Sequence, residues 1–170
     1  TRPVIVLPSY NGARKLPVLT PLLALLLARE GFAVLLHGMR TEAQRVLASE
    51  VLQRLEVPVW ERMQPLAAGQ VAHVATEVLH PGLARLLAVR QVLGLRTPGH
   101  SLVKLLAPCA GPAVLVGSYT HPEYSVLMRD VLVARQMTGL LSRGLEGEVV
   151  CDPRRQPRYD AVWQGQAYCV

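Results

Sequence analysis

One turn near the start of the chain has the position of a phosphate-binding site without its usual composition. The stretch VLPSYNGARKLPVLTP, residues 6–21, lies between a β-branched apolar run and an apolar run with helical spacing. In many α/β proteins a glycine-rich turn at this point lets backbone amides contact a phosphate. Here the stretch holds a single glycine, Gly12, which Arg14 and Lys15 follow. Such long cations suit the spaced phosphates of a polymer, and the alternative is a solvated turn in which Asn11 and Gly12 make the bend.

Other basic residues follow apolar runs in the same way. One group comes after residues 32–36, another after residues 138–141, and a third surrounds the end of a predicted helix near residue 94. Because the carboxyl ends of parallel strands meet at one edge of a sheet, these cations are expected to share that edge. We call this set the positive rim. Its candidate phosphate-binding residues are Arg14, Lys15, Arg40, Arg45, Arg90, Arg96, Lys104 and Arg143.

The composition agrees with a folded, basic protein. The chain has 170 residues, of which 51% are hydrophobic, so it can bury a substantial core as one domain. Its formal net charge is +6, and sixteen of its eighteen cations are arginine. A basic balance favours polyanionic partners. A generally arginine-rich proteome would give the same composition, so charge alone leaves both explanations open.

Several classes of site and location are disfavoured. Cys109, Cys151 and Cys169 are odd in number and widely spaced, which argues against a disulfide framework or a zinc site. The longest apolar run, PLLALLLA from Pro21, is much shorter than a membrane span. No signal peptide is visible. We therefore expect a cytoplasmic location and no metal.

The order of predicted elements indicates an α/β fold with a largely parallel central sheet and flanking helices. Continuous apolar runs predict buried strands, and runs with helical spacing predict helices between them. Two His-Pro pairs, at His80 and His121, are expected to start helices, and CDPRRQPRYD, residues 151–160, is expected to be a charged surface loop. The predicted strands are 4–7, 32–36, 113–119 and 138–141, and the predicted helices are 20–31, 45–57, 80–94 and 122–136.

Several motifs together resemble the anthranilate phosphoribosyltransferase and nucleoside phosphorylase superfamily (glycosyltransferase family 3), and within it the YbiB-type, DNA-binding branch. The markers span nearly the whole chain and are LPSYNGARK, LTPLLA, HG, HPGLARLLAVRQVLGLR, HSLVKLL, THPEY and GLEGEV. The resemblance implies the α/β domain of that superfamily over residues 1–170. It also implies a homodimer built through an upstream helical domain. The chain begins at Thr1 without a methionine, so we expect it to be part of a longer protein.

The chain departs from the catalytic pattern of that superfamily at three places. The family's glycine-rich GTGGD turn is replaced by PSYNGARK. The family's KHGNRAVSS element becomes LHGMRTEAQ, which keeps His37, Gly38 and Arg40 but loses the lysine, asparagine and paired serines. The family's magnesium-holding Asp-Glu pair falls on Glu148 and Val149, so one carboxylate is missing. The resemblance therefore implies that the donor site has been lost.

Some ligand-site positions of the family are nevertheless retained. Arg90 matches the arginine that helps to hold the aromatic carboxylate in the catalytic enzymes, ten positions after His80. It either marks an anion site kept for another ligand or satisfies local charge on a helix, and both interpretations stay open. The positions of this vestigial ligand site are Asn11, Gly12, His37, Gly38, His80 and Glu148.

The sequence therefore favours a non-catalytic protein that binds DNA largely independently of sequence, with RNA as a further polyanion to test. We expect no catalytic residues, no metal and no cofactor. The alternative is an active glycosyl or phosphoribosyl transferase with an altered donor site, which would need Mg²⁺. The fold alone does not decide between them.

Overall fold

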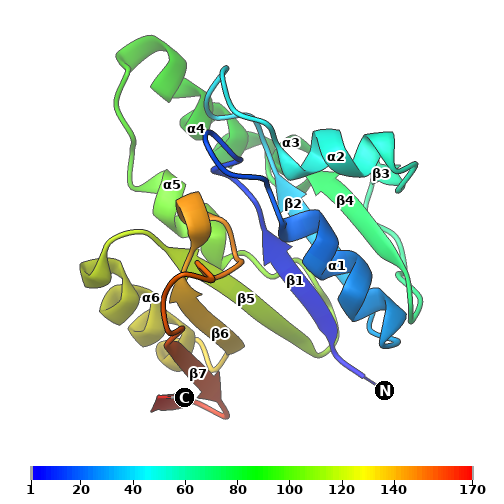
Figure 1. The fold of residues 1–170 in the computed structure, drawn as a ribbon, viewed down its shortest axis with the longest axis vertical. Helices are drawn as coiled ribbons and strands as arrows, with labels where there is room; N and C mark the ends of the chain where they lie inside the picture. The colour runs from blue at the N-terminus through cyan, green and yellow to red at the C-terminus, as the bar shows by residue number, and fades with distance from the viewer. Residues whose placement is uncertain (1, 170) are drawn as a thin grey trace.

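The computed structural model describes residues 2–169, and its centre is an eight-stranded sheet (Figure 1). The strand order is β3-β4-β2-β1-β5-β6-β7-β8. Neighbouring strands from β3 to β6 are parallel, and β7 and β8 add an antiparallel hairpin at one edge. The bounds are β1 Val4–Pro8, β2 Val34–Gly38, β3 Val59–Trp60, β4 Val71–Ala75, β5 Ala113–Tyr119, β6 Thr138–Arg143, β7 Tyr159–Trp163 and β8 Gln166–Cys169.

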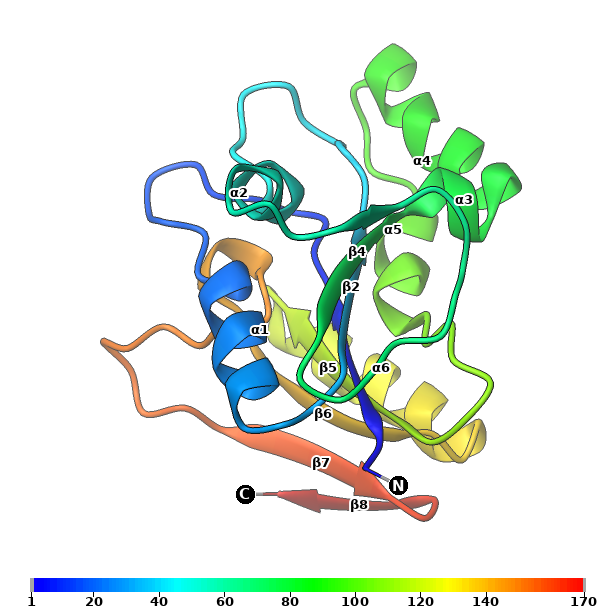
Figure 2. The same ribbon diagram turned by 90° about the vertical axis from the view of Figure 1, so that its right-hand side faces the viewer.

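Helices cover both faces of this sheet (Figure 2). Helices α1 and α2 lie on one face, and α4, α5 and α6 lie on the other. Two short 3-10 turns, η1 and η2, precede β5 and follow β6. The bounds are α1 Thr20–Arg29, α2 Ala48–Arg54, α3 Thr76–Leu79, α4 Pro81–Leu93, α5 Gly99–Leu102, η1 Val103–Leu105, α6 Pro122–Ala134 and η2 Leu145–Gly147.

Strand β1 contributes to a core on each face of the sheet. Successive side chains of a strand point to opposite faces. Ile5 and Leu7 pack with Ala24 of α1 in one buried cluster, whereas Val6 packs with Leu132 of α6 in another. A strand buried on both sides needs apolar residues at every position, which explains the unbroken VIVL run.

The predicted fold class and most predicted elements are confirmed. The strand predicted at residues 113–119 is β5, and the strand predicted at 138–141 extends to Arg143 as β6. His80 and His121 are the N-cap residues of α4 and α6, each followed by a helical proline as expected. Gly94 ends α4 with a left-handed backbone, which glycine adopts without a steric penalty.

Some elements differ from the prediction. Helix α2 begins at Ala48 rather than near Arg45, because Val46 instead forms a bridge with Ala13 of the turn after β1. Strands β3, β4, β7 and β8 were not predicted. The apolar side chains of α4 form only a narrow buried stripe, since Leu87 is buried but Val92 is 86% exposed. Nothing among residues 2–169 covers the outer face of that helix end.

Two buried histidines lie on neighbouring strands. His37 of β2 and His73 of β4 are buried, and their loss of hydration lowers the pKa of each to about 4. Neutral His37 fits its partners: Nε2 donates to the Leu106 carbonyl at 3.0 Å, and Nδ1 accepts from the Tyr10 hydroxyl at 2.8 Å. Tyr10 is also 2.8 Å from the Thr76 hydroxyl. This chain of hydrogen bonds ties the turn after β1 to β2, α3 and the segment after η1.

We expect acid to destabilise the protein through these histidines. Their folded pKa lies below the unfolded value near 6.5, so the unfolded state alone gains protons as the pH falls from 6.5 towards 4. Urea unfolding should show a free energy roughly 4 kcal/mol lower at pH 5 than at pH 7.5, about half of it from each histidine. His73→Leu should halve this loss, and an unchanged loss in that variant would contradict the assignment.

Candidate functional site

The turn after β1, residues 9–19, lies where ligands gather in parallel sheets. Strand β1 pairs with β2 on one side and with β5 on the other. The strand order therefore reverses at β1, which makes it the switch point of the sheet. Gly12 has a φ of +64°, and a Cβ there would contact the Val46 carbonyl at 2.6 Å. Gly38, at the end of β2, lies so close to the Ser9 carbonyl that a Cβ would collide with it. Both glycines therefore allow two backbone segments of the protein itself to lie close together.

The carboxylate of Glu148 occupies this turn. Its Oε1 accepts hydrogen bonds from the backbone amides of Asn11 and Gly12, at 2.9 and 2.8 Å. Its Oε2 accepts from the hydroxyls of Ser9 and Thr20, at 2.6 and 2.8 Å. Glu148 is only 3% exposed. Thr20, the first residue of α1, thus uses its hydroxyl to bind Glu148, and no side chain of the described residues caps the helix.

A second carboxylate, that of Glu146, holds the next part of the turn. It accepts from the backbone amides of Arg14, Lys15 and Leu16, the shortest of these contacts being 2.7 Å. Partial burial works to raise the pKa of Glu146, but the three amides outweigh it and lower the pKa. Glu146 has a φ of +52° and Gly147 a φ of +87°. This left-handed pair bends η2 so that both carboxylates reach the turn.

These contacts leave no place for the family's magnesium ion at its matching position. Both oxygens of Glu148 already accept protein donors, and the second carboxylate of the pair is replaced by Val149, which is buried in the apolar cluster beside α1. Mg²⁺ requires oxygen ligands in near-octahedral geometry. Among residues 2–169 no group of three or more histidine, cysteine, aspartate or glutamate side chains could hold a metal. The residues present do not fit the ion.

Three arginines of the positive rim converge on one carboxylate. Glu42 is contacted by Arg45 at 2.8 Å, by Arg90 at 2.7 Å and by Arg96 at 3.2 Å. Burial works to raise the pKa of Glu42, but hydrogen bonds from Arg45, Arg90 and Arg96 lower it to about 2. Nη1 of Arg90 is buried without a hydrogen-bond partner among the described residues. The cluster therefore keeps a surplus of positive charge although each guanidinium has a carboxylate partner.

Arg40 contacts α2 and the backbone of its own loop. Its guanidinium forms an ion pair with Glu50 of α2, and it donates to the backbone carbonyls of Glu42, Ala43 and Arg45. These bonds hold the loop between β2 and α2 in its path. The arginine retained in the LHGMR element therefore acts mainly on its own loop.

Lys104 does not lie on the exposed rim where it was expected. It is 8% exposed, and its Nζ donates to the Gly147 carbonyl at 2.9 Å and contacts the Ser118 carbonyl at 3.4 Å. Its burial lowers its pKa to about 8. Ser118 also donates to Gly147, at 2.7 Å. Lys104 thus holds η2 through the Gly147 carbonyl, and in this way it also helps to position Glu148.

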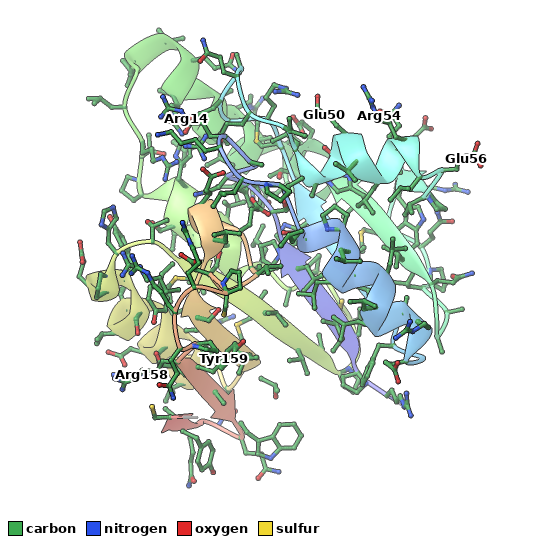
Figure 3. The ribbon with its side chains drawn as sticks, in the orientation of Figure 1. Arg14, Glu50, Arg54, Glu56, Arg158 and Tyr159 are labelled. Carbon is green, nitrogen blue, oxygen red and sulfur yellow. The ribbon has the colours of Figure 1, made fainter. Side chains whose placement is uncertain are left out.

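The remaining rim cations are open to solvent. Arg14, Lys15 and Arg143 are exposed, and no carboxylate among residues 2–169 lies within ion-pair distance of their side chains. Arg14 is labelled in Figure 3, at the same end of the molecule as α2. Lys15 and Arg143 line the same cavity beside η2. These three cations can therefore meet an external anion without breaking an internal ion pair.

The other positions of the vestigial ligand site have internal partners. His80 uses Nδ1 to accept from the Leu83 amide at 3.0 Å, which makes it the cap of α4. His37 is fully buried in its hydrogen-bond chain. The Asn11 side chain donates to the Glu146 carbonyl at 3.2 Å. Each of these three side chains therefore has a hydrogen-bond partner inside the protein.

Sequence reasoning missed the two acidic residues that organise the site. Neither Glu42 nor Glu146 is among the residues that the sequence predicts for the site. Their spacing from Arg45 and Glu148, three and two residues, was a weak local signal. Their long-range partners, Arg90 and the backbone of residues 14–16, lie far away in sequence.

Comparison with known proteins identifies relatives of this chain. No family model matches it. It is 36% identical over 163 residues to YbiB of Escherichia coli (strain K12), covering 93% of this chain and 51% of that protein. It is 30% identical over 151 residues to the anthranilate phosphoribosyltransferase of Thermus thermophilus, covering 84% of this chain and 45% of that enzyme. The chain thus spans about half the length of these relatives.

We expect Glu148 to stabilise the fold through its four donors. Glu148→Ala would leave two amides and two hydroxyls buried without an acceptor, and should lower the free energy of unfolding by about 3–5 kcal/mol. Glu148→Gln should cost only about 1–2 kcal/mol, because its oxygen still accepts from the amides while the Ser9 and Thr20 hydroxyls turn to accept from its NH₂ group. Denaturant unfolding measures both.

Glu61→Ala is the matched control, since Glu61 is exposed in the loop after β3. It should change the free energy of unfolding by no more than about 0.5 kcal/mol. If Glu148→Ala were as stable as this control, the carboxylate would not be holding the turn.

Proposed function

Because the chain belongs to the anthranilate phosphoribosyltransferase and nucleoside phosphorylase superfamily, in its YbiB-type branch, we propose that it binds nucleic acid without catalysis on a phosphoribosyltransferase-like scaffold. The partner we propose is DNA, contacted through its phosphates and largely independently of sequence. RNA carries the same phosphates and is the obvious comparison.

One observation carries the non-catalytic part of the proposal: the backbone amides of the turn after β1 are already occupied. In a phosphate-binding turn such amides face the ligand. Here those of Asn11 and Gly12 bind Glu148, and those of residues 14–16 bind Glu146. A diphosphate would have to displace two carboxylates that its own charge repels. This speaks against the transferase alternative, as does the absence of the paired serines from LHGMRTEAQ.

The open cations support the binding part. Arg14 and Lys15 lie in the turn after β1 and Arg143 is the last residue of β6, so they share one edge of the sheet. Three arginines share the single charge of Glu42 and add a further positive surplus. Phosphodiesters are attracted to such an edge without any need for base contacts. Weak sequence preference is the expected consequence.

The assembly belongs to the proposal as well. The family resemblance implies a homodimer built through a helical domain outside this chain, and two rims on one polymer would raise the effective concentration of the second contact. No helix in the described part of the chain is both long and apolar enough for a membrane span. We propose a cytoplasmic location.

The first functional prediction concerns the lost donor site. In a thermal-shift assay, phosphoribosyl diphosphate with Mg²⁺ should stabilise the protein no more than pyrophosphate with Mg²⁺, because no dedicated cradle or metal ligands are free. Turnover of anthranilate or of a nucleobase, abolished by Arg90→Ala, would show that the transferase alternative is correct.

The second functional prediction concerns the open cations. Removing two of them in Arg14→Ala/Lys15→Ala should weaken binding to every DNA sequence alike. It should also lower the slope of log affinity against log salt by about 0.9 for each phosphate that the variant no longer neutralises. Fluorescence anisotropy with labelled oligonucleotides at several salt concentrations gives both numbers.

Arg54→Ala/Arg62→Ala is the matched control, because it also removes two exposed arginines but lies on the β3 side of the sheet. This control should keep the wild-type salt slope. Equal loss of affinity in the two double variants would mean that binding follows net charge rather than the positive rim.

A further inference from the structure

A cavity of about 650 Å³ lies beside the positive rim, outside the turn that Glu148 fills. Its walls come from the ends of β5 and β6, from the turn after β1 and from the loop at residues 151–158. It therefore opens at the carboxyl edge of the parallel strands, where small ligands bind in such sheets. Its volume falls in the range that holds a nucleotide-sized ligand.

The loop that closes this cavity is anchored at one end on β6 and at the other on the residue that follows β6. Cys151 bridges Gly144, and Tyr159 pairs with Ser142 as β7 begins. The Cys151 thiol contacts the Ser142 and Tyr159 hydroxyls, each at 3.3 Å. Between these anchors the segment that precedes β7, orange in Figure 2, projects from the body of the molecule. These contacts fix both ends of the loop beside the cavity.

The charge of the cavity is strongly unbalanced. Five cations and two carboxylates line it, which leaves a surplus of three positive charges. The Glu146 carboxylate is turned to backbone amides, and Asp152 is held by Arg154 at 2.9 Å and Arg155 at 3.8 Å. The cations with no carboxylate in ion-pair distance within residues 2–169 are Lys15, Arg143 and Arg158. Figure 3 shows Arg158 beside Tyr159, far from Arg14.

This surplus suits a phosphate monoester better than a diester. A monoester carries close to two negative charges at neutral pH and three acceptor oxygens, whereas a diester in a polymer carries one charge. Arginines bind such groups with paired hydrogen bonds. Tyr119, Pro122 and Pro157 add an apolar wall on which the nucleoside part can lie.

We propose that this cavity binds a nucleoside phosphomonoester, either a free nucleotide or the 5′-phosphate at the end of a strand. The site does not include Glu148 or the amides that bind it, and it does not depend on binding along a polymer. Lys15 and Arg143 face it from the sheet edge, and Arg155 and Arg158 face it from the loop.

The test is calorimetric titration of the chain with 5′-AMP and with adenosine. AMP should saturate one site, and adenosine should bind at least roughly tenfold more weakly because it lacks the charged oxygens. Arg155→Ala/Arg158→Ala should weaken AMP binding roughly tenfold or more, whereas the matched control Arg54→Ala/Arg62→Ala should not change it. Arg158→Gln alone should weaken AMP binding in the same direction if the double variant folds poorly.

Two oligonucleotides distinguish the sources of the phosphate. Tighter binding of a 5′-phosphorylated strand than of its 5′-hydroxyl form, abolished in Arg155→Ala/Arg158→Ala, assigns the cavity to strand ends. AMP binding without that difference assigns it to free nucleotides. Equal binding of AMP and adenosine, no saturation by AMP, or equal effects of the two double variants would overturn the proposal. A lower salt slope in Arg14→Ala alone, at a residue that does not line the cavity, reports separately on polymer binding.

Discussion

Four hydrogen-bond donors converge on the buried carboxylate of Glu148, and the arrangement of the whole sheet edge depends on this contact. Buried amides and hydroxyls must find acceptors, because an unmet donor costs much more than a hydrogen bond gains. A phosphate-binding turn leaves its amides open for a ligand. Here the end of β1, the start of α1 and η2 are held together by a side chain of the protein itself. The turn is complete without any ligand.

Internal ion pairs decide which of the many cations can act outward. Glu42 gathers three arginines and Glu50 takes Arg40, while Lys104 is buried against carbonyls. At this edge of the sheet, the charges left open lie on the turn after β1, at the end of β6 and in the loop before β7. The positive rim therefore keeps open cations although part of its charge is neutralised inside the protein. Such a distribution attracts anions to that edge.

The fold itself was largely predictable because its signals are local. Apolar runs such as VIVL and AVLVGSY identify strands buried on both faces, and His80-Pro81 and His121-Pro122 identify helix starts. Strands β3, β4, β7 and β8 were not predicted, and the two at the sheet edges carry the weakest signal. Strand β3 has only two residues, and β8 has no buried residue, so neither carries a hydrophobic pattern. Their place is decided by pairing with a neighbour that is already formed.

The sequence by itself determined the family, the parallel α/β architecture and the loss of the glycine-rich turn, because these depend on residue types at fixed spacing. It also located the basic residues that follow the strands. Only the tertiary structure decided which of them are free, because that depends on carboxylates far away in sequence. Glu148 lies 136 residues from Gly12, and Glu42 lies 48 residues from Arg90. No local pattern encodes such distances, since folding alone brings these groups into contact.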